Sequence, residues 1–414
     1  MIRYSMKIRK DSALFFALTL PLFKPLSMDF FPVTSSLYSI LSIVTFVYVL
    51  LKAIKNKMKI HLVTQCMILL EIIIFISTAI NSGSMRNAVD NAILIVYAAI
   101  FINYCAEKGR MLLLIKSTML HLELCTYINL VTVIMKPDGF FTRTISAYGK
   151  TQEWFLGSDH YFVVWAIPAF LIATLYCELT GDKKRSFFLI CATIVTQFIK
   201  GSSTGLVGVL IFLLWLVIPI IRKVMTPFRC LIVAIVLFVS IVYLRNSDFL
   251  EPIIVGMLGK DMTFTNRLEI WDNSIKAIGN KPLLGYGILY TDAVIGLLGR
   301  TESGFIWRGA THCHNQFLQI GLMSGIIGLV AYIAAIVIAF WECRSCDNKR
   351  MGQVATICLF IFCVISITEV YQYPQMYMLF ILPCYLNNVE LNTMSNVLQM
   401  SQIEIDKREE ETEK

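Results

Sequence analysis

Apolar residues occur in long runs, separated by short polar stretches, along most of the 414-residue chain. A helix that crosses a lipid bilayer needs about 20 mostly apolar residues, and it satisfies its own backbone hydrogen bonds there. The pattern predicts an all-α, polytopic integral membrane protein with about twelve transmembrane helices. The runs cover approximately residues 12–31, 34–52, 60–80, 88–106, 111–135, 160–179, 186–200, 203–221, 228–245, 315–341, 351–370 and 373–388.

Composition narrows the class of protein further. Hydrophobic residues make up 57% of the chain and charged residues only 15%, whereas a typical soluble protein has about 25% charged residues. This composition excludes a soluble enzyme, an intrinsically disordered regulator and a nucleic-acid-binding protein. The formal net charge of +8 does not point to nucleic acid, because an excess of Lys and Arg on cytoplasmic loops gives the same balance in a membrane protein.

The basic residues on the connecting segments indicate an orientation. With both termini in the cytoplasm, the short inner segments carry most of the Lys and Arg residues, as the positive-inside rule requires. Two outer segments, 136–159 and 246–311, break this trend, but long segments are translocated largely regardless of their charge. The predicted organisation is therefore nine helices in residues 1–245, an extracytoplasmic catalytic loop over 246–312, three helices in 313–388 and an acidic cytoplasmic tail over 389–414.

The long loop is predicted to contain a short amphipathic helix. It begins after Asn266, a residue type suited to the N-cap position. Its apolar positions are spaced three or four residues apart and form one stripe, made of Leu268, Trp271, Ile275 and Ile278. We expect the helix to lie on the membrane surface with Trp271 at the headgroup level. The alternative is a surface helix that only closes the loop.

Two histidines and an asparagine, His312, His314 and Asn315, stand directly before the tenth run. At the N-terminus of a helix the macrodipole disfavours an imidazolium, so these histidines should stay neutral and able to accept a proton. The free N–H groups there also attract anions such as phosphate. A polar cap is the simpler interpretation of one such histidine, but two of them below a loop with several basic residues favour a site.

Three motifs in this region together resemble the O-antigen ligase and Wzy-type polysaccharide polymerase superfamily. They are Asn266-Arg267-x-x-Ile270-Trp271, Pro282-Leu283-Leu284-Gly285-Tyr286-Gly287, and His312-x-His314-Asn315-x-Phe317-Leu318-Gln319 followed by Gly325-Ile326-Ile327-Gly328-Leu329. Their order and their placement on one large loop are similar to the family over residues 200–330. The resemblance implies an enzyme of the bacterial plasma membrane that takes sugars from undecaprenyl diphosphate at the outer face, without a nucleotide sugar, a metal or another cofactor.

The resemblance also implies roles for individual residues. The family's loop arginine falls on Arg267 and its key histidine on His314, which would act as the general base of an inverting transfer. A Ser-Arg-Gly turn of the family reads Ser203-Thr204-Gly205 here. Lys200 is therefore the candidate to supply the missing charge, as a point cation rather than a bidentate fork. The other candidates for substrate binding are Arg143, Arg308, His312, Asn315 and Glu369.

The favoured function is a polysaccharide polymerase that joins undecaprenyl-diphosphate-linked oligosaccharide repeat units into capsule, exopolysaccharide or O-antigen. A ligase that moves finished glycan to a lipid core or to protein shares this chemistry and stays open, because no motif reveals the acceptor. A flippase for the same lipid-linked sugars is disfavoured by the single long loop and by the lack of matched halves. The expected partners are the lipid-linked oligosaccharide and the bilayer, with flippase and chain-length regulator proteins as further candidates.

Overall fold

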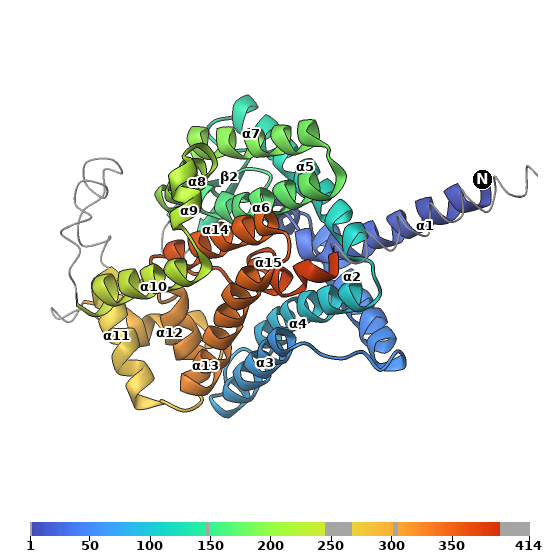
Figure 1. Cartoon of the computed structure of the whole chain (residues 1–414). Coiled ribbons are helices and arrows are strands. Elements are labelled where there is room, and N and C mark those ends of the chain that lie inside the picture. The colour runs from blue at the N-terminus through green and yellow to red at the C-terminus, as the bar shows by residue number, and fades with distance from the viewer. Residues whose placement is uncertain (1, 146–148, 245–266, 301–304, 390–414) are drawn as a thin grey trace, which may run out of the picture.

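The computed structural model describes residues 2–145, 149–244, 267–300 and 305–389, and helices make up most of it (Figure 1). The helices of the first half are α1 (Ile2–Thr19), η1 (Leu20–Phe23), η2 (Leu26–Phe30), α2 (Pro32–Lys55), α3 (Leu62–Ile80), α4 (Met85–Glu107), α5 (Met111–Met135), η3 (Asp159–Tyr161), α6 (Phe162–Thr180) and α7 (Lys183–Lys200). Those of the second half are α8 (Ser203–Val217), α9 (Pro219–Val224), α10 (Pro227–Phe238), η4 (Val239–Tyr243), α11 (Arg267–Asn280), α12 (Thr291–Leu298), α13 (Gln316–Ser345), α14 (Lys349–Ile365), α15 (Pro374–Ile381) and η7 (Leu382–Tyr385).

A β-hairpin between α5 and α6 departs from the predicted all-α fold. Strands β1 (Phe141–Ile145) and β2 (Gly149–Glu153) pair antiparallel, with Phe141 opposite Glu153. Strand β1 contains two threonines and an isoleucine, and such β-branched residues favour extended backbone. The hairpin pairs the backbone groups of a connecting segment that is too polar to form an apolar helix.

Each of the twelve predicted apolar runs contains helix in the structure. Six helices within the described ranges are long and apolar enough to cross a membrane, and two shorter apolar helices accompany them. The six are Pro32–Lys55, Leu62–Ile80, Met85–Glu107, Met111–Met135, Asp159–Thr180 and Gln316–Ser345, and the shorter two are Ser203–Val217 and Pro227–Tyr243. These helices mark a polytopic membrane protein, while a count of twelve transmembrane helices stays a prediction.

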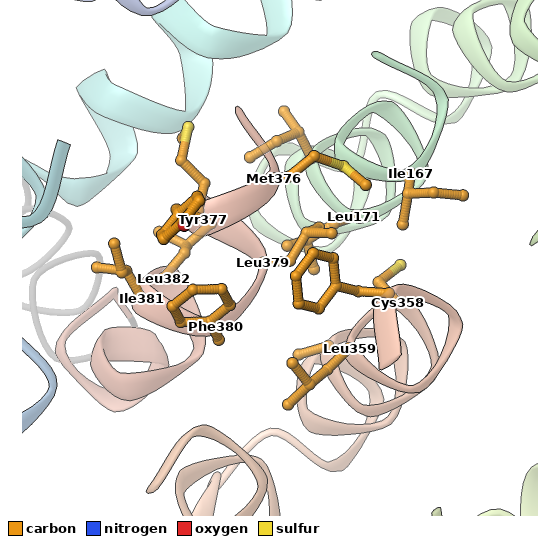
Figure 2. Close-up of a cluster of buried hydrophobic side chains, with 14 of the residues drawn as sticks. Ile167, Leu171, Cys358, Leu359, Met376, Tyr377, Leu379, Phe380, Ile381 and Leu382 are labelled. Carbon is orange, nitrogen blue, oxygen red and sulfur yellow. The ribbon is translucent and has the colours of Figure 1, made fainter. Parts of the chain in front are cut away.

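Helix α6 lies at the centre of the bundle. It is buried over most of its length, which happens when other helices rather than lipid surround a helix. Figure 2 shows Ile167 and Leu171 of α6 gathered with Cys358 and Leu359 of α14 and with Leu379 of α15. Because lipid tails are as apolar as these side chains, close packing rather than removal from water holds such helices together.

Helix α13 is interrupted at Gly325, whose backbone is left-handed with a φ of 59°. The loop segment 282–288 fits against this interruption. Its backbone N–H groups donate to carbonyl groups just before the break, Tyr286 to Leu322 at 2.7 Å and Gly287 to Met323 at 2.9 Å. The polar backbone of this segment is therefore paired by the bundle, as a non-helical segment packed against apolar helices requires.

Helix α11 is the predicted loop helix, and its expected N-cap residue Asn266 lies outside the described residues. Trp271 has no exposed surface, so it does not contact lipid headgroups, and its level relative to the membrane stays a prediction. It belongs to a second apolar cluster together with Leu298 of α12 and with Leu318 and Leu322 of α13. The apolar stripe of α11 is thus covered by protein, and α11 is fixed to the start of α13.

Two glycines at the contact between the loop and the bundle give the first prediction. A Cβ at Gly287 would lie 2.3 Å from Thr78 Cα in α3, and a Cβ at Gly325 would lie 2.3 Å from the carbonyl carbon of Leu283. Both glycines also have positive φ, which costs an L-residue free energy. Gly287→Ala or Gly325→Ala should therefore lower the free energy of unfolding by about 3 kcal/mol, seen as a lower thermal midpoint of the purified protein in detergent.

The matched control for these variants is Gly279→Ala. Gly279 lies in α11, and a Cβ there would meet nothing within 4 Å. Alanine is the better helix former, so the thermal midpoint of this variant should stay the same or rise. A midpoint for Gly287→Ala that equals the control would contradict the contact between the loop and α3, and the same result for Gly325→Ala would contradict the contact between the loop and α13.

Candidate active site

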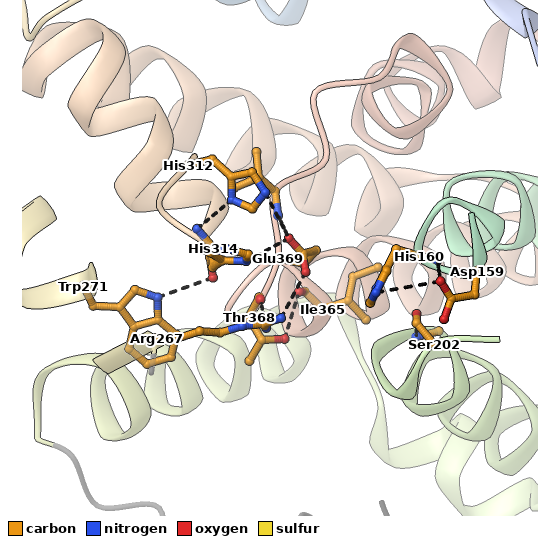
Figure 3. A network of polar contacts seen from close by, with 12 residues as sticks. Asp159, His160, Ser202, Arg267, Trp271, His312, His314, Ile365, Thr368 and Glu369 are labelled. Carbon is orange, nitrogen blue, oxygen red and sulfur yellow. Dashed lines mark hydrogen bonds and ion pairs between the residues drawn. The ribbon is translucent and has the colours of Figure 1, made fainter. Parts of the chain in front are cut away.

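Three segments that are distant in sequence meet in one polar cluster (Figure 3). They are the first turn of α11, the residues directly before α13, and the loop between α14 and α15. The cluster consists of four predicted site residues, Arg267, His312, His314 and Glu369. We call it the His–Glu cluster.

Glu369 is the centre of the His–Glu cluster, and its side chain is only 14% exposed. One carboxylate oxygen, Oε1, lies 3.4 Å from His314 Nδ1 and 3.8 Å from His312 Nε2. The other, Oε2, accepts a hydrogen bond of 3.2 Å from Arg267 Nη2, while Arg267 Nη1 donates to the carbonyl oxygen of Thr368. Burial alone would raise the pKa of Glu369, but His314 and the Arg267 charge outweigh it and hold this pKa well below its usual range. The carboxylate is therefore ionised at neutral pH.

His312 is held as a neutral imidazole. Burial, reinforced by the adjacent His314, lowers the pKa of His312 to about 3. Its Nδ1 accepts a hydrogen bond of 3.1 Å from the backbone N–H of His314, so the proton of the neutral ring is assigned to Nε2. That N–H is directed at Glu369, and the two imidazole rings lie with their centroids 3.9 Å apart.

His314 has a strained backbone and a ring that faces Glu369. Its φ of 46° lies in the left-handed region, a conformation that costs a residue with a side chain free energy and that occurs at functional sites. Trp271 Nε1 donates to its carbonyl oxygen at 3.4 Å. Its Nδ1 faces Glu369 Oε1 at 3.4 Å, and both ring nitrogens are buried without a regular hydrogen bond to the described residues. The ring thus lies beside a carboxylate with Nε2 on its other side, an arrangement that suits a general base.

Two imidazoles and a carboxylate in the His–Glu cluster are of the residue types that bind metal ions. One ligand atom each of His312, His314 and Glu369 lies within 4.8 Å of the others. Arg267 bonds Oε2 of Glu369, so Oε1, the oxygen that faces the histidines, stays available. A metal ligand must be an unprotonated nitrogen or a carboxylate oxygen. In the assigned tautomer of His312 the nitrogen that faces this point carries a proton, and binding of a metal would release it.

Asn315 lies beside the His–Glu cluster but uses its side chain within the fold. It is the N-cap of α13, where its Oδ1 accepts from the N–H of Leu318 at 2.9 Å. Its Nδ2 donates to the carbonyl oxygen of Ile367 at 2.9 Å, and the residue has no exposed surface. Asn315 therefore joins the His314 segment to the Glu369 loop.

The remaining predicted residues lie on other elements. Arg143, on β1, forms a two-point ion pair with the buried Glu153 on β2, at 2.6 and 3.2 Å. Lys200, at the end of α7, lies over the ring of Trp154 at 5.6 Å. Arg308 is exposed in the segment before His312. Within the described part of the chain, neither Lys200 nor Arg308 has a carboxylate partner.

The structure also shows polar residues that the sequence did not single out. Asp159 and His160 form the short helix η3 just before α6, with His160 Nε2 3.8 Å from Asp159 Oδ1. Figure 3 shows this pair on the side of Glu369 away from Trp271. The only sequence signal was an acidic residue followed by a histidine at the start of an apolar run, which is too common to indicate a site.

A comparison with protein families places the central part of the chain. Residues 186–333 match the family model described as O-antigen ligase. This span contains Lys200, Arg267, Arg308 and the His312–Asn315 segment, whereas Glu369 lies beyond its end. In the structure, the matched span begins in α7 and ends in α13.

Several curated proteins are similar to the chain. A candidate polysaccharide ligase of Rickettsia conorii is 26% identical over 249 residues, which are 58% of each chain. The exopolysaccharide production protein ExoQ of Rhizobium meliloti is 30% identical over 110 residues, 25% of this chain and 23% of ExoQ. The ComP-specific O-oligosaccharyltransferase of Acinetobacter baylyi is 27% identical over 205 residues, 48% and 35% of the two chains. The matches thus span at most 58% of the length of these three relatives.

The two bonds of Asn315 give the second prediction. Asn315→Ala removes the cap of α13 and leaves the Ile367 carbonyl oxygen without its donor, which together should cost about 2–3 kcal/mol of unfolding free energy. Asn348→Ala is the matched comparison, because Asn348 caps α14 through its Oδ1 alone, and it should cost about 1 kcal/mol. Thermal midpoints of the purified variants measure the difference. An Asn315→Ala protein as stable as wild type would show that the amide is free to serve the substrate.

Proposed function

We propose, from the membership of this chain in the O-antigen ligase and Wzy-type superfamily, that it transfers a glycan from undecaprenyl diphosphate to an acceptor hydroxyl at the outer face of the bacterial plasma membrane. The relatives named as ligases and oligosaccharyltransferases transfer glycosyl groups. The observation that carries the proposal for this chain is the orientation of His314, with Nδ1 facing Glu369 and Nε2 without a partner among the described residues.

The proposed step uses His314 as the general base. Nε2 takes the proton of the acceptor hydroxyl while its oxygen forms a bond to the anomeric carbon of the donor sugar. The bond from that carbon to the diphosphate oxygen breaks, and its electron pair stays on the diphosphate. Attack from the face opposite the leaving group inverts the anomeric centre. Glu369 stabilises the imidazolium that forms, as the carboxylate does in a Ser-His-Asp triad.

The charges suggest how the diphosphate is held. Arg267 and Arg143 each have a carboxylate partner, so their charges are largely compensated. Lys200 and Arg308 are the predicted cations without such a partner among the described residues, and they are the better candidates to stabilise the leaving charge. The main role of Arg267 is then to hold Glu369 and the backbone of Thr368 in position. Its remaining N–H groups are available to the substrate.

The acceptor separates the two enzyme candidates. The family description and the names of two relatives favour a ligase, which would move glycan to a lipid core or to protein. The name of ExoQ, an exopolysaccharide production protein, keeps a polymerase of repeat units as the second candidate. Both would use the same donor and the same His–Glu cluster.

The third prediction concerns the glycans of cells that lack this protein. The wild-type gene should restore the mature glycan, and His314→Ala should not, at equal protein level. His61→Ala is the matched control, because His61 caps α3 and lies outside the His–Glu cluster, and it should restore the glycan. Normal product with His314→Ala would overturn the assignment of the base.

The intermediate that accumulates identifies the activity. A single lipid-linked repeat unit on the outer leaflet indicates a polymerase, and long polymer that stays on its lipid carrier indicates a ligase. A lipid-linked unit confined to the inner leaflet indicates a flippase and would overturn the proposed transfer.

The fourth prediction concerns the charge of Glu369 and the neutrality of His312. Glu369 is ionised at neutral pH, because its pKa lies well below the usual range. Glu369→Gln removes the charge that stabilises the imidazolium of the proposed step, so kcat should fall by about 100-fold or more. His312→Gln should leave the pH dependence of kcat/KM between pH 5 and 8 unchanged, because a His312 with a pKa of about 3 is neutral throughout that range. A profile that changes in this range with His312→Gln would show that His312 titrates there.

A further inference from the structure

We propose that Asp159 and His160 on η3 bind the acceptor glycan and set the specificity for it. This inference rests on the proposed transfer reaction and adds a second side to its site. The His–Glu cluster supplies a base and an anchored carboxylate, but its side chains are mostly buried. An acceptor must also be held by groups that reach the solvent side of the cluster.

Helix η3 is fixed relative to the His–Glu cluster by an aromatic contact. The ring of Tyr161, the last residue of η3, packs edge to face against Tyr373 with the centroids 5.6 Å apart. Tyr373 ends the loop that carries Glu369 and begins α15. Edge-to-face pairs of this kind contribute to stability beyond the area they bury. The contact therefore fixes the position of Asp159 and His160 beside the Glu369 loop, and Figure 3 shows His160 between Glu369 and Asp159.

The side chains of η3 are more exposed than Glu369 of the His–Glu cluster. The side chains of His160 and Asp159 are 61% and 39% exposed, against 14% for Glu369. Asp159 Oδ1 accepts from the backbone N–H of His160 at 3.0 Å, which orients the carboxylate. In the described structure Asp159 has no Lys or Arg partner. An oriented, accessible carboxylate next to an imidazole can accept from, and donate to, neighbouring hydroxyl groups of a sugar.

The charge of Asp159 favours the acceptor over the diphosphate as the ligand of η3. A carboxylate repels a diphosphate, whereas it accepts strong hydrogen bonds from neutral hydroxyl groups. The charge of η3 thus points to a neutral glycan rather than to the diphosphate as its ligand.

The test measures transfer by the full-length protein in proteoliposomes. Labelled lipid-linked oligosaccharide from cells that lack the protein is the donor, and unlabelled acceptor glycan from the same cells is varied. Asp159→Ala should raise the KM for the acceptor about tenfold, the loss expected for a hydrogen bond to a charged group, and leave kcat and the KM for the donor within twofold. His160→Gln should raise the same KM by a smaller factor. Asp90→Ala, which removes an exposed aspartate paired with Arg86 on α4, is the matched control and should change neither constant.

The other outcomes have separate meanings. An unchanged acceptor KM for Asp159→Ala, with a thermal midpoint equal to wild type, overturns the role of η3. A raised donor KM would assign η3 to the donor and also overturns it. A fall in kcat alone would make Asp159 part of the chemical step and contradict binding. If the wild-type protein transfers no glycan in this assay, while His314→Ala cells still make normal product, the proposed function itself fails.

Discussion

A buried carboxylate needs compensating partners, and the site of this protein is organised around that need. Glu369 cannot stay ionised with a mostly buried side chain unless positive or hydrogen-bonding groups surround it. Arg267 reaches it from α11, and the two histidines reach it from the segment before α13. Removing one partner of such a group commonly costs several kcal/mol, because the remaining charge is left buried. The electrostatic requirement therefore holds three distant segments in one arrangement.

That arrangement depends in turn on backbone contacts further along the loop. The segment 282–288 bonds to the interrupted helix α13, and the apolar face of α11 packs on the first turns of the same helix. Asn315 then bonds to the carbonyl oxygen of Ile367, two residues before Glu369. The loop helix, the histidines and the Glu369 loop are thus positioned by α13. The described part of the loop is therefore fixed to the bundle through α13.

The helices could be predicted from the sequence, whereas the contacts within the His–Glu cluster could not. Long apolar runs locate helices well, because apolar character extends over a whole segment. Arg267 and His314 were identified by motif, yet their ion pairs with Glu369 depend on how α14 and α15 turn, which no local pattern encodes. Trp271 was placed at the membrane surface because its stripe looks the same whether lipid or α13 covers it. Asn315 was assigned to the substrate because capping and ligand binding use the same amide. The hairpin and the η3 pair were missed because their signals are only a few residues long.

The end of the matched region has a consequence for how this protein can be divided. The match to the family model described as O-antigen ligase ends at residue 333, which is inside α13 and before Glu369. A fragment cut at that border would keep Arg267, His312 and His314 but lose the anion that balances them, together with α14 and α15. Exchanging the matched span between relatives would likewise join two histidines from one protein to a carboxylate loop from another. The region matched by the family model is therefore smaller than the part of the chain that forms the His–Glu cluster.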